Sequence, residues 1–110
     1  MVVDVDLLFH ALADPTRREI VSVVLSTEQS VSDLARLFPM SFAAVQKHVV
    51  VLEAAGLVRK QRSGREQRVS GNVDALREAH RQLDRLEAVW RGRIDRIGEL
   101  LAEPDTKEQR

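Results

Sequence analysis

Cysteine and tyrosine are both absent from this 110-residue sequence. Without cysteine the chain has no disulfide framework, no thiolate metal site and no cysteine nucleophile, and it suits a reducing compartment. The three histidines, His10, His48 and His80, lie on separate predicted elements, and no glycine-rich phosphate loop occurs. The sequence therefore predicts a protein that is not an enzyme and that has no bound cofactor or metal.

Long hydrophobic runs are also missing. The apolar stretch 49–52 is far shorter than the roughly 20 residues that a membrane span needs. The first residues include the acids Asp4 and Asp6, where a signal peptide would carry bases. We therefore expect a cytoplasmic protein with no membrane partner.

Charge is balanced overall, with 17 basic and 17 acidic residues, but it is unevenly distributed. The window 59–68 has a net charge of +4, because five bases are opposed only by Glu66. These bases are Arg59, Lys60, Arg62, Arg65 and Arg68. Such a cluster is typical of a nucleic-acid-binding surface even when the net charge is zero. The length and the 44% apolar content favour one folded domain over residues 1–102, followed by a polar, disordered tail over 103–110.

Hydrophobic spacing predicts three helices in the first forty residues. The first ends near Asp14, and Asp14-Pro15 begins the second, because aspartate accepts hydrogen bonds from free N–H groups and proline suits a first turn. Ser30 caps a short third helix, with Asp33 as the partner in a near capping box. The inward-facing residues expected in these helices are Val5, Leu8, Phe9, Leu12, Ile20, Val23, Val24, Val31, Leu34, Ala35 and Phe38.

A fourth helix over 42–55 follows Ser41 as its cap, turns Val45, Val49 and Leu52 inward, and ends at Gly56. Two short polar runs around Ser63-Gly64 then predict a β-hairpin over 57–70. A long helix begins at Val73 and has apolar residues at a mean spacing close to 3.6. These are Leu76, Ala79, Leu83, Leu86, Trp90, Ile94, Ile97 and Leu101. The helix is longer than so small a domain could cover.

The sequence thus predicts a mostly α fold with a small β-hairpin, of the α+β class, in the order α-α-α-α-β-β-α. The third and fourth helices have the spacing of a helix-turn-helix, and the hairpin would be its wing. The N-terminal end of helix 42–55 would enter the major groove of double-stranded DNA, and the wing, about 58–70, would contact the backbone or minor groove. The candidate DNA-binding residues are Ser41, Phe42, Ala43, Gln46, Lys47, His48, Arg62, Arg65 and Arg68.

Several of these candidates have a chemical rationale. Gln46 can pair bidentately with adenine, Phe42 and Ala43 can meet thymine methyl groups, and Lys47 can reach guanine or phosphate. Two alternatives stay open at this point. Phe42 could instead pack in the core, and His48 could be a packed or phosphate-bonded side chain.

Four segments resemble the ArsR/SmtB-type winged-helix repressors. Segment 10–18 (HALADPTRR) is similar to their opening signature, and segment 31–35 (VSDLA) to the start of their first DNA-binding helix. Segment 41–58, which ends in LEAAGLV, resembles their recognition helix and its exit, and segment 64–66 (GRE) resembles their wing tip. The resemblance covers residues from about 7 to 101.

This resemblance implies a winged helix-turn-helix transcriptional regulator, often a repressor of its own gene. It also implies a homodimer formed through the first and last helices, which would bind a pseudo-palindromic operator with recognition helices one duplex turn apart. The predicted dimer-interface residues are Leu8, Leu12, Leu83, Leu86, Trp90, Ile94 and Ile97.

The sequence departs from the metal-sensing members of the family. Those members have a Cys-x-Cys-Asp motif where residues 30–33 here read Ser-Val-Ser-Asp, and hydroxyls cannot replace thiolates for a soft metal. His80, with Asp84 and Glu87 at helical spacing, leaves open a weak site on the last helix. The resemblance therefore implies the cysteine-less, non-metal subgroup. The effector stays open between an organic ligand, a metal held by carboxylates and histidine, and none.

A protein-interaction module is the main alternative to a DNA-binding regulator. Its long helix would be the partner surface, and the protein would have a different protein as its partner and no preference for DNA. The basic hairpin argues against this alternative.

Overall fold

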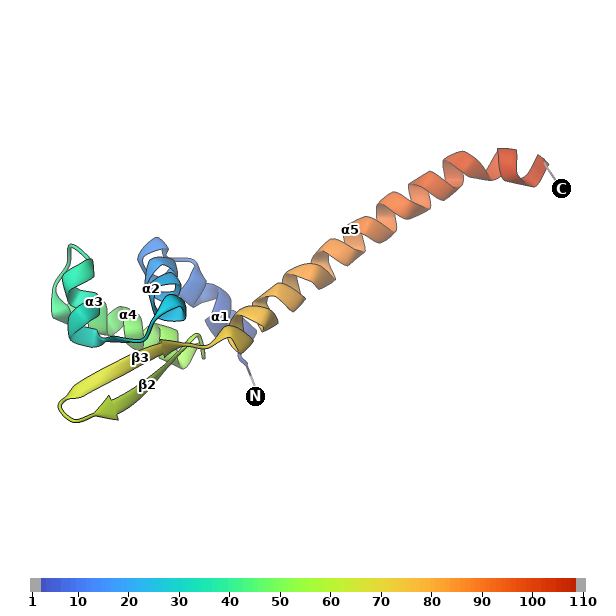
Figure 1. The fold of residues 1–110 in the computed structure, drawn as a ribbon. Helices are drawn as coiled ribbons and strands as arrows, with labels where there is room; N and C mark the ends of the chain where they lie inside the picture. The colour runs from blue at the N-terminus through green and yellow to red at the C-terminus, as the bar shows by residue number, and fades with distance from the viewer. Residues whose placement is uncertain (1–2, 109–110) are drawn as a thin grey trace. The chain divides into compact units, whose positions relative to one another are not determined.

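The computed structural model describes residues 3–108, with side chains described as far as residue 102. Its elements are α1 (Val5–Leu12), α2 (Pro15–Ser26), β1 (Gln29–Ser30), α3 (Val31–Leu37), α4 (Phe42–Ala54), β2 (Val58–Ser63), β3 (Glu66–Gly71) and α5 (Val73–Glu108). This order confirms the predicted mostly α fold with a β-hairpin, and helices α1 to α4 gather above the β2–β3 hairpin in Figure 1. The chain divides into two compact units, one as far as Ala79 and the other from His80 onward.

Helices α2, α3 and α4 begin at the predicted caps. The Asp33 N–H donates to the Ser30 Oγ at 2.9 Å, and the Ser30 N–H donates to the Asp33 Oδ2 at 3.4 Å, which confirms the capping box at the start of α3. The Asp14 Oδ2 accepts from the Arg17 N–H at 2.9 Å, and the Ser41 Oγ accepts from the Ala44 N–H at 3.1 Å. These side chains satisfy N–H groups that a helix N-terminus leaves without partners.

The core of the first unit is formed by one face of each helix. Val45, Val49 and Leu52 of α4 are fully buried, as their spacing predicted. The predicted inward positions of α1 to α3 are also buried or packed against this core, except Val5, which is partly exposed and is not among the residues of the core cluster. Gly56, at φ +78°, turns the chain from α4 toward β2, which confirms its predicted role as the helix stop. The opposite face of α4 is therefore left free to contact something other than this core.

A third strand, which the sequence does not predict, joins the hairpin. β1 pairs antiparallel with β3, with Gln29 opposite Val69 and Ser30 opposite Arg68, so the sheet order is β1-β3-β2. A strand of two residues is too short to show an alternating pattern. Its pairing attaches the hairpin to the start of α3, which fixes the wing beside the helix-turn-helix.

Asn72 joins three elements in one hydrogen-bond network. This side chain is only 5% exposed, and its Nδ2 donates to the Gly56 carbonyl at 2.8 Å. Its Oδ1 accepts from the Asp74 N–H at 3.2 Å and from the Arg59 Nη2 at 3.4 Å. The end of α4, strand β2 and the first turn of α5 are thereby held together.

Helix α5 is continuous from Val73 to Glu108. The disordered tail expected over 103–110 stays a prediction, because the side chains after residue 102 and all of residues 109–110 lie outside the described part of the chain. Among residues 3–108, no helix combines the length and the apolar character that crossing a bilayer requires.

Candidate nucleic-acid interface

The outer face of α4 is the first component of the candidate interface. Because the inner face is fixed in the core, the side chains on the opposite side of the helix point to solvent. They are Phe42, Ala43, Gln46, Lys47 and Val50, and all five are exposed. Phe42 is 49% exposed, so this side chain is available for contact, although it could also have packed in the core. Ser41 is exposed as well, and its hydroxyl is the cap described above.

A depression of about 240 Å³ brings this helix face next to the wing. The residues around it come from α3, α4 and the hairpin, and they are Val31, Ser32, Phe42, Gln46, Arg62, Arg65, Glu66 and Gln67. Four of the predicted DNA-binding residues therefore share one concave surface, although up to 23 residues separate them in the sequence. They are Phe42, Gln46, Arg62 and Arg65.

A second, more open depression lies along the outer face of α4. Its volume is about 510 Å³, and it is lined by Ala43, Gln46, Lys47, Val50 and Val51. Val50 is 50% exposed, and the sequence analysis did not select it. Its spacing was the available signal, because Val50 follows Gln46 by four residues and Ala43 by seven, which places all three on one helix face.

The wing bases fall into two groups. Lys60 pairs with Glu53, with Nζ to Oε1 at 3.4 Å, and Arg59 reaches Asn72, so both are directed toward the protein. Arg62 and Arg65 are exposed, and within the described residues neither side chain has an ion-pair or hydrogen-bond partner. Two free guanidinium groups next to the outer face of α4 form a positively charged edge that suits phosphate.

Arg68 differs from the other wing arginines in its contacts. Its Nε donates to the Glu28 Oε1 at 2.8 Å, and its Nη1 donates to the Glu66 Oε2 at 3.2 Å. These two carboxylates, Glu28 first, raise the pKa of the guanidinium. The double pairing argues against the predicted DNA contact of Arg68. This residue instead links β3 to the segment before β1.

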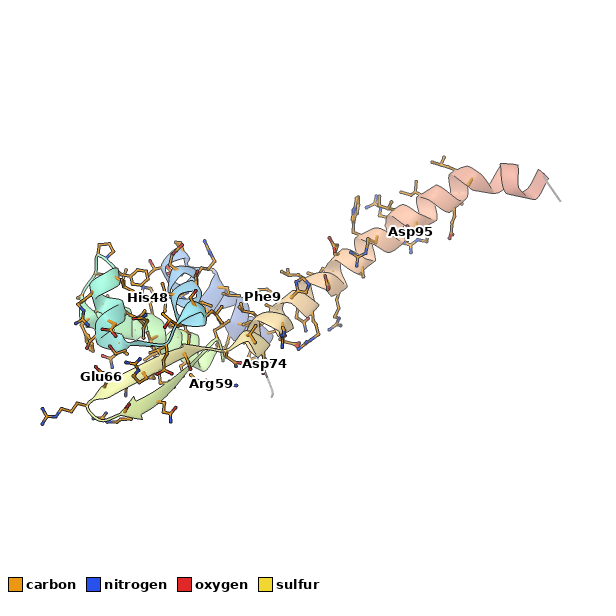
Figure 2. The ribbon with its side chains drawn as sticks, viewed as in Figure 1. Phe9, His48, Arg59, Glu66, Asp74 and Asp95 are labelled. Carbon is orange, nitrogen blue, oxygen red and sulfur yellow. The ribbon has the colours of Figure 1, made fainter. Side chains whose placement is uncertain are left out.

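His48, which is labelled in Figure 2, is a partly exposed residue of α4. Its Nδ1 lies 3.5 Å from the Arg17 Nη1 and 3.9 Å from the Asp14 Oδ2, at the start of α2. The hydrogen bond from the Arg17 N–H, then the positive charges of Arg17 and His48, lower the pKa of Asp14 against the opposing effect of burial. Because His48 faces the start of α2, its geometry argues against the predicted DNA contact.

The junction of α1 and α2 also gives segment 10–18 a structural role. The Arg17 Nε donates to the Ala11 carbonyl at 2.7 Å, and its Nη2 donates to the His10 carbonyl at 3.0 Å. The Arg18 Nη1 donates to the Leu12 carbonyl at 2.8 Å. Two arginines therefore satisfy the last carbonyls of α1, while Asp14 caps the helix that carries them.

The three candidate metal ligands on the last helix do not converge on one point. The His80 Nε2 lies 3.4 Å from the Asp84 Oδ2, but the Glu87 carboxylate is paired with Arg91. Across the described part of the chain, no three His, Asp or Glu side chains gather closely enough to hold a metal ion.

The predicted dimer-interface residues have two different environments. Those on α5 lie on one stripe, and each is between 45% and 70% exposed in the single chain; they are Leu83, Leu86, Trp90, Ile94 and Ile97. Three pairs of apolar residues on α5 are eleven residues apart: Leu83 and Ile94, Leu86 and Ile97, and Trp90 and Leu101.

The two α1 residues of the predicted interface are less accessible. Leu8 has no exposed surface, which argues against its predicted interface contact, because the core of its own chain already covers it. Leu12 is partly buried against that core. Leu7, which is 42% exposed, is the apolar side chain that α1 leaves available.

Comparisons with known proteins agree with this architecture. Residues 14–60 match the family described as bacterial regulatory protein, arsR family. An ArsR-like transcriptional regulator from Rhodococcus sp. RHA1 has a solved structure that is 36% identical, with a TM-score of 0.77. The match covers 87% of this chain and 91% of that one.

Two further relatives match at lower identity. The transcriptional repressor SdpR of Bacillus subtilis (strain 168) is 28% identical over 72 residues, which are 66% of this chain and 80% of the repressor. A homodimeric winged helix-turn-helix DNA-binding domain from Mycobacterium bovis, a possible ArsR-family regulator, is 25% identical with a TM-score of 0.63. That match covers 76% of this chain and 77% of the other. These relatives are named as regulators, and none of the three is named as an enzyme.

Proposed function

This chain belongs to the ArsR family and is a transcriptional regulator with a winged helix-turn-helix, and on that premise we propose that it is a homodimeric repressor of a pseudo-palindromic operator. In this proposal α4 enters the major groove of double-stranded DNA. The wing, β2 and β3, contacts the backbone or the minor groove. The two protomers address the two half-sites.

The proposal depends above all on the surface shared by α4 and the wing. Phe42 and Gln46 reach that surface from a helix whose opposite face is buried, and Arg62 and Arg65 border it with unpaired positive charge. Base edges are read by side chains on a rigid helix, and phosphates are held by guanidinium groups at its edge. This arrangement supports both tasks at once.

The exposed stripe on α5 supports the dimer. Large apolar side chains gathered on one helix face indicate a protein interface, because water is excluded from them when they pack. The M. bovis relative is a homodimer, which supports the same assembly here, and SdpR is a repressor, which supports the direction of regulation. In two copies related by two-fold symmetry, the same stripe would meet itself.

The decisive experiment is selection of the purified protein against random DNA duplexes at near-physiological salt. We expect enrichment of an inverted repeat whose half-site centres lie about 10 base pairs apart, or a multiple of that. Binding without enrichment of any sequence would contradict sequence-specific repression. That result would favour the alternative in which α5 binds a different protein.

Three single variants then separate the roles of α4 and the wing. Gln46→Ala should change the preferred base at one position, by about 1–3 kcal/mol of discrimination. Arg65→Ala should weaken binding to all duplexes and lower the salt dependence by about one counterion. Arg68→Ala is the matched control, because its guanidinium is held by two carboxylates, and it should leave the salt dependence unchanged. Equal losses on specific and random DNA for Gln46→Ala and Arg65→Ala would contradict these roles.

A further inference from the structure

We propose that α4 reads A·T base pairs, with Ala43 and Val50 contacting the 5-methyl groups of thymines and Gln46 contacting an adenine between them. This inference rests on the proposed function, because it assumes that α4 enters the major groove. It assigns a specificity role to Val50 and names the class of base pair that the half-site contains.

The outer face of α4 lacks two of the side-chain types that read G·C base pairs. Arginine is the commonest bidentate reader of guanine, and acidic side chains accept from the amino group of cytosine. Neither type occurs among the five exposed residues of this face, and Glu53, one turn further along, is paired with Lys60. Lys47 is the sole cation on the face, and a lysine ammonium reaches phosphate as readily as guanine.

The larger depression on α4 has a mostly apolar lining. Three of its five lining residues, Ala43, Val50 and Val51, are apolar, and Val50 is 50% exposed. In the major groove the apolar group that projects from a base pair is the thymine 5-methyl group. Contact between this methyl and Val50 would remove both from water, which is favourable in proportion to the area covered.

Gln46 lines the same depression. Gln46 follows Ala43 by three residues and precedes Val50 by four, so its amide lies between the two apolar side chains on one helix face. A glutamine amide matches the N6 and N7 groups of adenine. The helix rises by about 10 Å from Ala43 to Val50, so all three contacts fall within one run of three to four base pairs.

The test uses the operator found by the selection described above and the full-length protein. Each thymidine of one half-site is replaced in turn by deoxyuridine, which lacks only the 5-methyl group. We expect one or two positions at which the affinity falls by about threefold to tenfold. At the position read by Val50, the same replacement should have no further effect on the Val50→Ala variant.

Val73→Ala is the matched control, because Val73 is also a half-exposed valine of the same unit, at the start of α5. It should keep the wild-type response to every deoxyuridine. A selected half-site with only G·C pairs opposite α4, or a specific operator with no deoxyuridine effect, would overturn this inference while the proposed function stands. If the affinity of Val50→Ala still falls at every position where deoxyuridine weakens wild-type binding, the assignment of Val50 is wrong. If the selection enriches no sequence, both proposals fail.

Discussion

Ser30 illustrates how much a single side chain decides in this small fold. It is 1% exposed, it caps α3, it exchanges hydrogen bonds with Asp33, and its backbone lies in β1. A hydroxyl at this position therefore has a structural purpose where metal-sensing relatives, by the family resemblance, have a thiolate. The sequence could predict the cap because capping depends on residues three apart.

We expect Ser30→Ala to lower the free energy of unfolding by about 1 kcal/mol, because the Asp33 N–H loses its acceptor in a buried setting. Ser32→Ala is the control, since Ser32 is exposed in the first turn of the same helix, and it should change stability by less than about 0.5 kcal/mol. Urea denaturation of both variants measures the difference. Similar losses for the two serines would contradict the capping role.

Two carboxylates should make the stability fall in acid. Hydrogen bonds from the Ser30 side chain and backbone hold the pKa of Asp33 below its usual value of 3.8, and the Arg17 N–H acts in the same direction on the pKa of Asp14. A lowered pKa in the folded state stabilises the fold above the unfolded pKa. That stabilisation is lost as the pH falls through the folded pKa, where the unfolded chain binds more protons.

We therefore expect the free energy of unfolding to fall as the pH drops from about 5 to below 3.8. The double variant Asp14→Asn with Asp33→Asn keeps acceptors at both positions but removes these two titrations. Its stability should depend less steeply on pH in this range. Denaturation curves at several pH values provide the measurement, and identical slopes for variant and wild type would refute the assignment.

Helix α4 was predictable as an element because its two faces follow from one period. Val45, Val49 and Leu52 are buried and Gln46 and Lys47 exposed, as spacing alone requires. Val50 was missed because it stands in an apolar run, where hydrophobicity suggests burial although its position places it outside. The pairing of Arg68 with Glu28, forty residues away, depends on the sheet register and leaves no local signal in the sequence.

Strand β3 approaches helix α2 so closely that only glycine fits at position 71. A Cβ there would lie 2.5 Å from the Leu25 Cδ2 and 3.0 Å from the Leu25 Cα. We expect Gly71→Ala to destabilise the protein by about 1–3 kcal/mol, because the backbone of the two elements must separate.

Gly92→Ala is the opposite case within α5, where the added methyl meets only the Arg96 Nη1 at 3.7 Å. It should raise helix stability by up to about 1 kcal/mol, since alanine favours helix over glycine. Urea denaturation measures the effect at position 71. The far-UV circular dichroism of the whole protein during heating, to which the long helix α5 contributes, measures the effect at position 92. A Gly71→Ala variant as stable as the wild type would show that α2 and β3 can move apart without cost.

The molecule as a whole is predicted to be active only as a pair of chains. Leu86→Asp should weaken dimerisation by at least about a hundredfold, because each protomer loses a leucine that the proposed interface would bury and gains an unpaired charge there. Arg85→Asp introduces the same residue next to it, away from the apolar stripe, and should leave the dimer intact. Sedimentation equilibrium distinguishes the two, and a dimeric Leu86→Asp variant would locate the interface elsewhere.

Leu8 shows that the spacing of apolar residues cannot by itself identify a dimer interface. Its position in α1 correctly placed it on the apolar face, but the sequence could not say whether that face meets the chain's own core or a partner. Only the accessible surface of the folded unit distinguishes the two. For α5 the mean spacing predicted a stripe, and the exposure of Leu86 and Ile97 leaves it uncovered in the single chain.

Because the apolar stripe on α5 repeats every eleven residues, the helix could be shortened by one such block without moving the stripe to another face. Eleven residues span three turns at about 3.67 residues each, slightly more than the ~3.6 of an ideal helix, so a stripe with this repeat favours a right-handed supercoil in place of the left-handed one of a heptad repeat. Deleting one such block would shorten the helix by about 16 Å and leave the remaining apolar side chains in phase. Deleting nine residues would rotate everything beyond the cut by about half a turn. The length of α5 can therefore change in steps of eleven residues while its apolar side chains stay on the same helix face.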